Sequence, residues 1–145
     1  MLQTFPYGTD IHQATFGLFL KSDNIKIDFL SWNLPFIRPA LIVGQWRLLD
    51  IPDIAAMKFF AILRRGEKND YVDIAELLKT YTISTLISFY LERHPDSDSS
   101  VILRYLSSYA DIEKQPMPLM LNQTTWDDSK QIIQDSISDF LKKGS

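Results

Sequence analysis

The chain has 145 residues, a mass of 16.8 kDa and 46% hydrophobic residues, enough for one domain with a sizeable core. Its formal net charge of -3 at pH 7 excludes the strongly basic proteins that wrap duplex DNA or coat anionic membranes. It contains no cysteine, which removes disulfides, thiolate metal sites and cysteine nucleophiles. No apolar run reaches the ~18 residues of a membrane span, and we expect no signal peptide. These features favour a cytoplasmic protein with neither a membrane nor duplex DNA as its partner.

The first 50 residues predict short β structure. Apolar residues, beginning with Phe16, alternate over 16–20 and again over 25–29, with a polar Ser-Asp-Asn turn between them. This alternation is typical of a β-hairpin. In the second strand Asp28 lies on the face opposite to the apolar residues. Prolines then favour an extended connector, and residues 43–49 are predicted as a further short strand.

From residue 52 the apolar spacing becomes helical. The pattern predicts helices over 54–65, from 69 or 70 onward, from Thr82 to a point before Pro95, after the polar loop 96–100, and from Thr125. Asp50 is the predicted cap of the first helix, Gly66 its end, and Thr125 with Asp128 a capping box. The sequence therefore predicts an α+β fold in a single domain, 1–145. A short antiparallel β segment over 1–50 precedes about five helices over 51–145.

Lys58 stands out because it lies among apolar residues of the first predicted helix. An unpaired buried ammonium is costly, so Lys58 either extends to solvent or meets an anion. Spacing alone favours a structural ion pair with Asp28 or Asp73. Asp70 and Asp73 lie three residues apart on one face of the next predicted helix, near its start, where helix capping alone explains at least one carboxylate.

The basic cluster of the sequence consists of Arg64, Arg65 and Lys68, around a predicted helix end. Charges in such a place are typical of a solvated surface. The two histidines, His12 and His94, are far apart without the spacing of metal ligands, so we expect both at the surface. No motif of a zinc protease, serine hydrolase, dinucleotide-binding protein or P-loop protein occurs.

Residues 53–78 combine an Asp-Ile-Ala-Ala-Met-Lys opening, an Arg-Gly-x-Lys-x-Asp turn and an Asp-x-x-Asp-x-x-x-Leu-Leu close. This segment resembles the C-terminal signature of the AbiEii-type nucleotidyltransferase-like toxins. Three further blocks match in the same order. These blocks are the strand 25–30, the Pro35 connector leading to Arg47-Leu48, and residues 109–113 with 116–118 before Trp126. The resemblance covers roughly residues 14–140.

The resemblance implies a nucleotidyltransferase sheet with a helical C-terminal part. The implied reaction transfers a nucleoside monophosphate from an NTP to an RNA or protein acceptor, with Mg²⁺. Lys58 resembles the family lysine that contacts NTP phosphate, and Asp70 with Asp73 resembles the closing acidic motif near the active site. Asp28 resembles the strand aspartate beside the metal. The predicted catalytic residues are Asp28, Lys58, Asp70 and Asp73, and the predicted phosphate-binding residues are Lys58, Arg64, Arg65 and Lys68.

The chain departs from the family pattern at its N-terminal side. Family members begin with a Gly-Gly/Ser loop and an Asp-x-Asp pair on the first strand, whereas Gly8-Thr9-Asp10 is only a superficial echo of that loop. We therefore expect a truncated homologue, a fragment or one piece of a split protein that is inactive alone. By resemblance its partners are an antitoxin protein and a tRNA acceptor, and an unpaired sheet edge predicts a homodimer. The alternative is a non-catalytic protein-interaction module or dimeric remnant of that fold.

Overall fold

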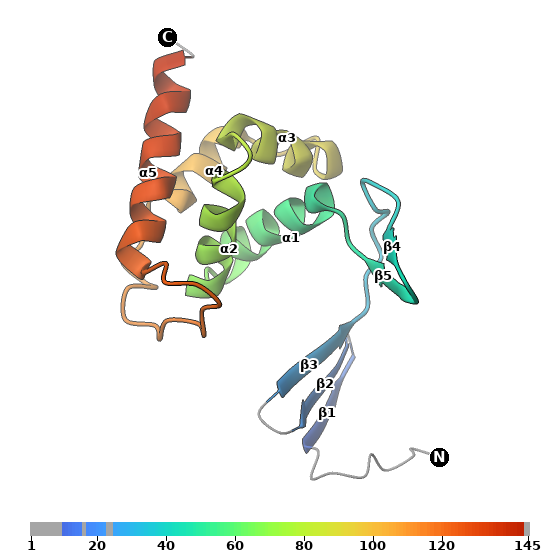
Figure 1. Cartoon of the computed structure of the whole chain (residues 1–145). Coiled ribbons are helices and arrows are strands. Elements are labelled where there is room, and N and C mark those ends of the chain that lie inside the picture. The colour runs from blue at the N-terminus through green and yellow to red at the C-terminus, as the bar shows by residue number, and fades with distance from the viewer. Residues whose placement is uncertain (1–9, 16, 23–24, 144–145) are drawn as a thin grey trace. The chain divides into compact units, whose positions relative to one another are not determined.

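The structure, a computed structural model, describes residues 10–15, 17–22 and 25–143. Within these residues it contains five helices and two small antiparallel sheets, which confirms the predicted α+β class (Figure 1). The chain divides into two compact units, Met1–Pro35 and Phe36–Ser145. The second sheet thus belongs with the helices, and the single domain over 1–145 stays a prediction. No described helix is long and apolar enough to cross a membrane.

The first unit is a three-stranded antiparallel sheet in the order β1-β2-β3. Its strands are β1 Asp10–Ala14, β2 Gly17–Ser22 and β3 Ile25–Leu30. The predicted hairpin corresponds to β2 and β3, although Phe16 lies outside the described residues. Sequence alternation does not predict β1, which has few apolar residues. Leu20 on the central strand is buried, whereas all six residues of β3 are exposed.

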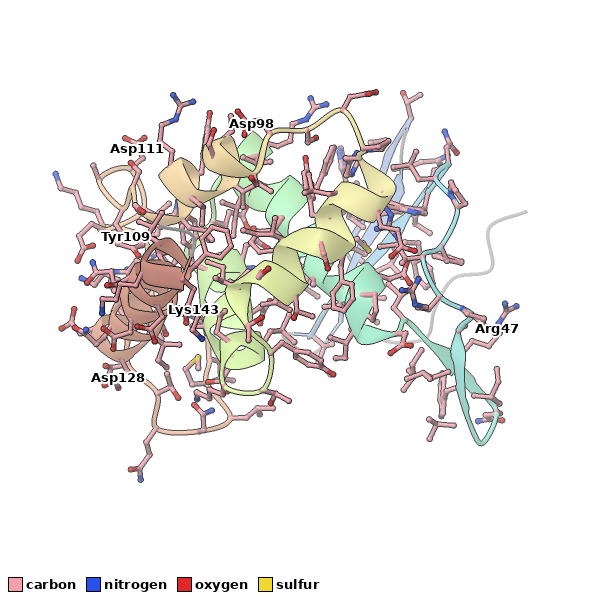
Figure 2. All side chains as sticks on the ribbon, turned by 90° about the horizontal axis from the view of Figure 1, so that it is seen from above. Arg47, Asp98, Tyr109, Asp111, Asp128 and Lys143 are labelled. Atoms are coloured by element: carbon pink, nitrogen blue, oxygen red, sulfur yellow. The ribbon has the colours of Figure 1, made fainter. Side chains whose placement is uncertain are left out.

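A second, two-stranded sheet opens the other unit. It pairs β4, Leu41–Val43, with β5, Trp46–Leu48. Gly44 in the turn has φ +60°, a conformation that glycine adopts without strain. The predicted strand over 43–49 thus contains a turn followed by β5. All six strand residues are exposed, and Figure 2 shows the side chain of Arg47 extending away from the hairpin.

Five helices form the rest of this unit. They are α1 Ile51–Arg64, α2 Lys68–Leu78, α3 Ile83–Arg93, α4 Ser99–Leu106 and α5 Trp126–Lys143. The predicted cap Thr82 accepts a hydrogen bond from the Thr85 N–H at 3.2 Å. The predicted capping box is also present, because Asp128 N–H donates to Thr125 Oγ1 at 3.1 Å and Thr125 N–H to Asp128 Oδ2 at 2.8 Å. These local bonds set where the helices begin.

Helix α1 is central to the packing, since it contacts α2, α3 and α4, while α5 packs on α2 and α3 (Figure 1). Gly66 directs the chain from α1 into α2 with φ +57°, and its N–H donates to the Ala61 carbonyl at 3.2 Å. The core lies between these helices. Its largest fully buried apolar side chains are Phe59, Ile62, Ile74, Leu86, Ile102, Leu106 and Ile133.

A buried ion pair joins the start of α1 to the end of α3. Asp53 is 0% exposed, and its carboxylate pairs with the guanidinium of Arg93, whose side chain is 2% exposed. The same carboxylate accepts the backbone N–H groups of Ile37 at 2.9 Å and Arg38 at 3.0 Å. Asp53 therefore holds the segment before the hairpin against two helices.

Replacing Arg93 by Met should lower the free energy of unfolding by about 3–5 kcal/mol, because the Asp53 carboxylate then stays buried without its cation. Denaturant unfolding followed by circular dichroism measures the change. Arg38→Met is the control, since Arg38 pairs with Glu92 in an exposed bridge and its loss should change the free energy of unfolding far less. Equal losses in the two variants would contradict the central role of the buried pair.

Candidate functional site

The structure brings Lys58, Asp70 and Asp73 together where α1 packs on α2. Lys58 Nζ lies 3.2 Å from Asp70 Oδ1 and 2.5 Å from Asp73 Oδ2. The turn at Gly66 returns the chain so that the first turns of α2 meet the middle of α1. The three-residue spacing on α2 places both carboxylates on one helix face. The predicted pairing of Lys58 with Asp73 is therefore present, and Asp70 joins it.

The side chains of the cluster differ in their exposure. Asp70 is only 1% exposed, whereas Lys58 is 26% and Asp73 47% exposed. The guanidinium of Arg65 lies 3.5 Å from Asp70 Oδ2, and the Arg65 side chain is 55% exposed. Two cations thus face two carboxylates, and Asp73 is the more exposed of the two carboxylates.

The carboxylates keep Lys58 charged. Burial, the largest single effect, lowers the pKa of Lys58, but the hydrogen bonds and charges of Asp73 and Asp70 together outweigh it. The pKa of Lys58 is consequently raised above 10.5, its ordinary value. At neutral pH the side chain is an ammonium, the form that attracts a phosphate.

The other basic residues predicted at this site have different surroundings. The Arg64 guanidinium lies over the Phe60 ring, 5.1 Å from its centre. Lys68 is buried, and its ammonium donates to the carbonyls of Glu113 at 3.0 Å and Gln115 at 2.6 Å. Lys68 therefore ties the segment after α4 to the start of α2. Phosphate binding by Arg64, Arg65 and Lys68 stays a prediction.

Asp28 lies on β3, in the other compact unit. Its carboxylate is 3.1 Å from Lys26 Nζ, and its partner across the sheet is Phe19. Neither neighbour is a ligand that Mg²⁺ prefers. Among residues 10–15, 17–22 and 25–143, no three His, Asp or Glu side chains gather as metal ligands. Magnesium binding at Asp28 stays a prediction.

Two further features were not predicted. His94, expected at the surface, is half-buried and stacks on Phe60 at 5.6 Å between ring centres. A pocket of about 550 Å³ lies at the α2–α3 turn and the end of α5, where Figure 2 labels Lys143. Its lining includes Tyr81 and Phe140 but no residue of the Lys58 cluster. No sequence motif marks this pocket.

Comparisons with models of known protein families, with curated proteins and with solved structures found no match. The AbiEii resemblance therefore remains an interpretation of the sequence.

Replacing Lys58 by Met should lower the free energy of unfolding by about 3 kcal/mol at pH 7, since Asp70 loses a partner while Arg65 still faces it. The raised pKa of Lys58 gives the sign of the pH dependence. Its contribution is fully present below the unfolded pKa near 10.5 and is lost as the pH rises through the higher folded pKa. Unfolding measurements from pH 7 to 11 should therefore show the two proteins converging.

Lys142→Met is the matched control. Lys142 pairs with Asp139 at 3.5 Å in an exposed bridge and should cost under about 1 kcal/mol at any pH. A Lys58→Met protein as stable as wild type at pH 7 would mean that Lys58 contributes no buried pairing.

Proposed function

We propose that this chain is a nucleotidyltransferase-like protein of the AbiEii toxin family, inactive alone, in which Lys58 contacts the triphosphate of an NTP. One observation carries the proposal. The family signature implies a lysine and two carboxylates at the active site, and here the ammonium of Lys58 on α1 lies within 3.2 Å of both carboxylates on α2. A structural ion pair explains the contacts equally well, and the 47% exposure of Asp73 is what makes its replacement by a phosphate feasible.

The arrangement suits exchange of one partner for another. Asp70 is buried and also forms an ion pair with the ammonium, so the position of Lys58 does not depend on Asp73 alone. Asp73 lies on the solvent side, where a phosphate oxygen can replace its carboxylate. An ammonium complements a phosphate as a point charge, and this bond is stronger in a partly desolvated place. The Lys58 ammonium would thus orient the triphosphate through the N–H donors that otherwise bind Asp73.

Nucleotide transfer requires more carboxylates than the described strands present. No Asp-x-Asp pair occurs on any described strand, and Asp28 is paired with Lys26. In this family Mg²⁺ supplies charge stabilisation at the reacting phosphate. The proposal therefore assigns binding of the triphosphate to this chain and leaves the metal ligands to a different segment. An antitoxin partner and a tRNA acceptor belong to the same family expectation.

A second candidate function is a protein-interaction module. The observation in its favour is the β4–β5 hairpin, whose apolar side chains are unusually exposed. The exposed fractions are 47% for Leu41, 68% for Ile42, 56% for Val43, 66% for Trp46 and 47% for Leu48. All but Ile42 share one face of the hairpin, and soluble proteins seldom expose such an apolar face without a partner.

Substitutions on the two sides of the ion pair should change ATP binding in opposite directions. Lys58→Met should weaken binding of metal-free ATP at least about tenfold, because one charge-assisted hydrogen bond is lost. Asp73→Asn should strengthen it, because the competing carboxylate is removed while the ammonium remains. Isothermal titration calorimetry of the chain with ATP in EDTA measures both changes.

The matched control is the exposed Lys142–Asp139 bridge on α5. Lys142→Met and Asp139→Asn make the same charge changes and should leave ATP affinity within about twofold. If both Lys58 and Asp73 variants behave like these controls, or if the wild-type chain does not bind ATP, the phosphate role of Lys58 is wrong. The interaction module is then the better reading.

The chain should not transfer nucleotide by itself, because Asp28 alone cannot hold the metal. Incubation with radiolabelled NTPs, Mg²⁺ or Mn²⁺ and bulk tRNA tests this, with label in tRNA or protein as the readout. Strong labelling that Asp28→Asn abolishes would contradict the expectation.

A further inference from the structure

The β3 strand is an exposed edge of the first sheet. It lies at one end of the order β1-β2-β3, and all six of its residues are exposed. Ile25, Ile27 and Phe29 share one face and are 63%, 41% and 58% exposed. An edge strand presents backbone N–H and C=O groups on its outer side, and apolar side chains on such a strand favour pairing with another chain.

The charges on β3 have no complementary neighbour across the sheet. Lys26 and Asp28 flank Ile27 on the opposite face, 3.1 Å apart from Nζ to Oδ2. In the β2–β3 register Lys26 lies opposite Lys21, a like charge, and Asp28 lies opposite Phe19. Opposite charges directly across two strands are stabilising, and like charges are destabilising. A strand that pairs with the outer edge of β3 can therefore supply the opposite charges that β2 does not supply.

We propose that β3 pairs antiparallel with β3 of a second copy of this chain, about a two-fold axis that passes between the two Ile27 residues. The sequence Ile-Lys-Ile-Asp-Phe of residues 25–29 is self-complementary in this register. Lys26 lies opposite Asp28 of the partner subunit, and Asp28 opposite Lys26 of the partner subunit. Ile25 lies opposite Phe29 of the partner subunit, so the apolar face continues across the interface.

Other two-fold registers lack this complementarity. An axis at Lys26 places the two Lys26 side chains opposite each other, and an axis at Asp28 does the same with the two carboxylates. A slip of one residue has no two-fold axis and would place Ile25 opposite Asp28, an apolar residue opposite a charged one. The pairing about Ile27 thus has a specified register. It is independent of the proposed phosphate contact, whose residues lie in the helical unit.

A single introduced cysteine tests the register, because the chain has none of its own. In Ile27→Cys the two Cα atoms across the axis would be ~4.5–5.5 Å apart, within the range that a disulfide spans. In Ile25→Cys, on the same face of the same strand, the two cysteines would be four residues apart along the strands, roughly 13 Å. Mild oxidation should give a covalent dimer with Ile27→Cys and little with Ile25→Cys.

Charge reversal tests the pairing without a cross-link. Lys26→Asp opposes Asp with Asp across the axis, and Asp28→Lys opposes Lys with Lys, so each variant should raise the dimer dissociation constant at least tenfold. A 1:1 mixture should recover the dimer, because every charge pair between the two variants is again complementary. Both variants have lost the pair within the chain, so recovery cannot come from it. Sedimentation velocity over a concentration series measures all three samples.

Lys142→Asp is the matched control, since Lys142 and Lys26 have the same 72% exposed side chain. It should leave the dissociation constant of the dimer unchanged. A wild-type chain that stays monomeric at all concentrations, equal cross-linking at 25 and 27, or a mixture that remains monomeric would overturn the proposal. If a charge variant fails to fold, the cysteine pair decides alone.

Discussion

The helical unit depends on one buried carboxylate. A charge removed from water must be paired and hydrogen-bonded, and Asp53 meets this requirement with the Arg93 guanidinium and the N–H groups of Ile37 and Arg38. These partners belong to α3 and to the segment before the hairpin. The requirement therefore fixes α1 in place, and α1 carries Lys58. The position of the candidate site is in this sense a consequence of an ion pair elsewhere on the same helix.

Local rules predicted most helix boundaries. The caps at Thr82 and Thr125 are local, because the backbone donors at a helix start are satisfied by a residue three positions away. Gly66 is likewise marked by the backbone conformation that ends α1. The strands were harder to predict. β4 has three apolar residues in succession, without the alternation that reveals a half-buried strand, and its structure depends on pairing with β5.

The candidate site was predictable only in part. The cost of burying an ammonium indicated that Lys58 meets a carboxylate, and helix spacing placed Asp70 and Asp73 on one face. In the sequence Asp53 is an acidic residue in the first turn of a helix, a place where the helix dipole alone accounts for a negative charge. Its partner Arg93 is 40 residues away. The sequence places Lys68 in one basic cluster with Arg64 and Arg65. The carbonyls that bind its ammonium are 45 and 47 residues away. Such contacts follow from tertiary packing, which a single sequence does not specify.

The two ionic clusters on α1 differ in what they can bind. Both oxygens of Asp53 are occupied by protein donors at 0% exposure, so a ligand would have to replace several bonds without access from solvent. Lys58 is 26% exposed and has an outer partner, Asp73, that is 47% exposed. Exchange of Asp73 for an anion would leave the inner contact with Asp70 intact, with Arg65 still facing the buried carboxylate. Partner exchange is thus chemically reasonable at Lys58 and unfavourable at Asp53. This difference is the physical reason to seek phosphate binding at the Lys58 cluster.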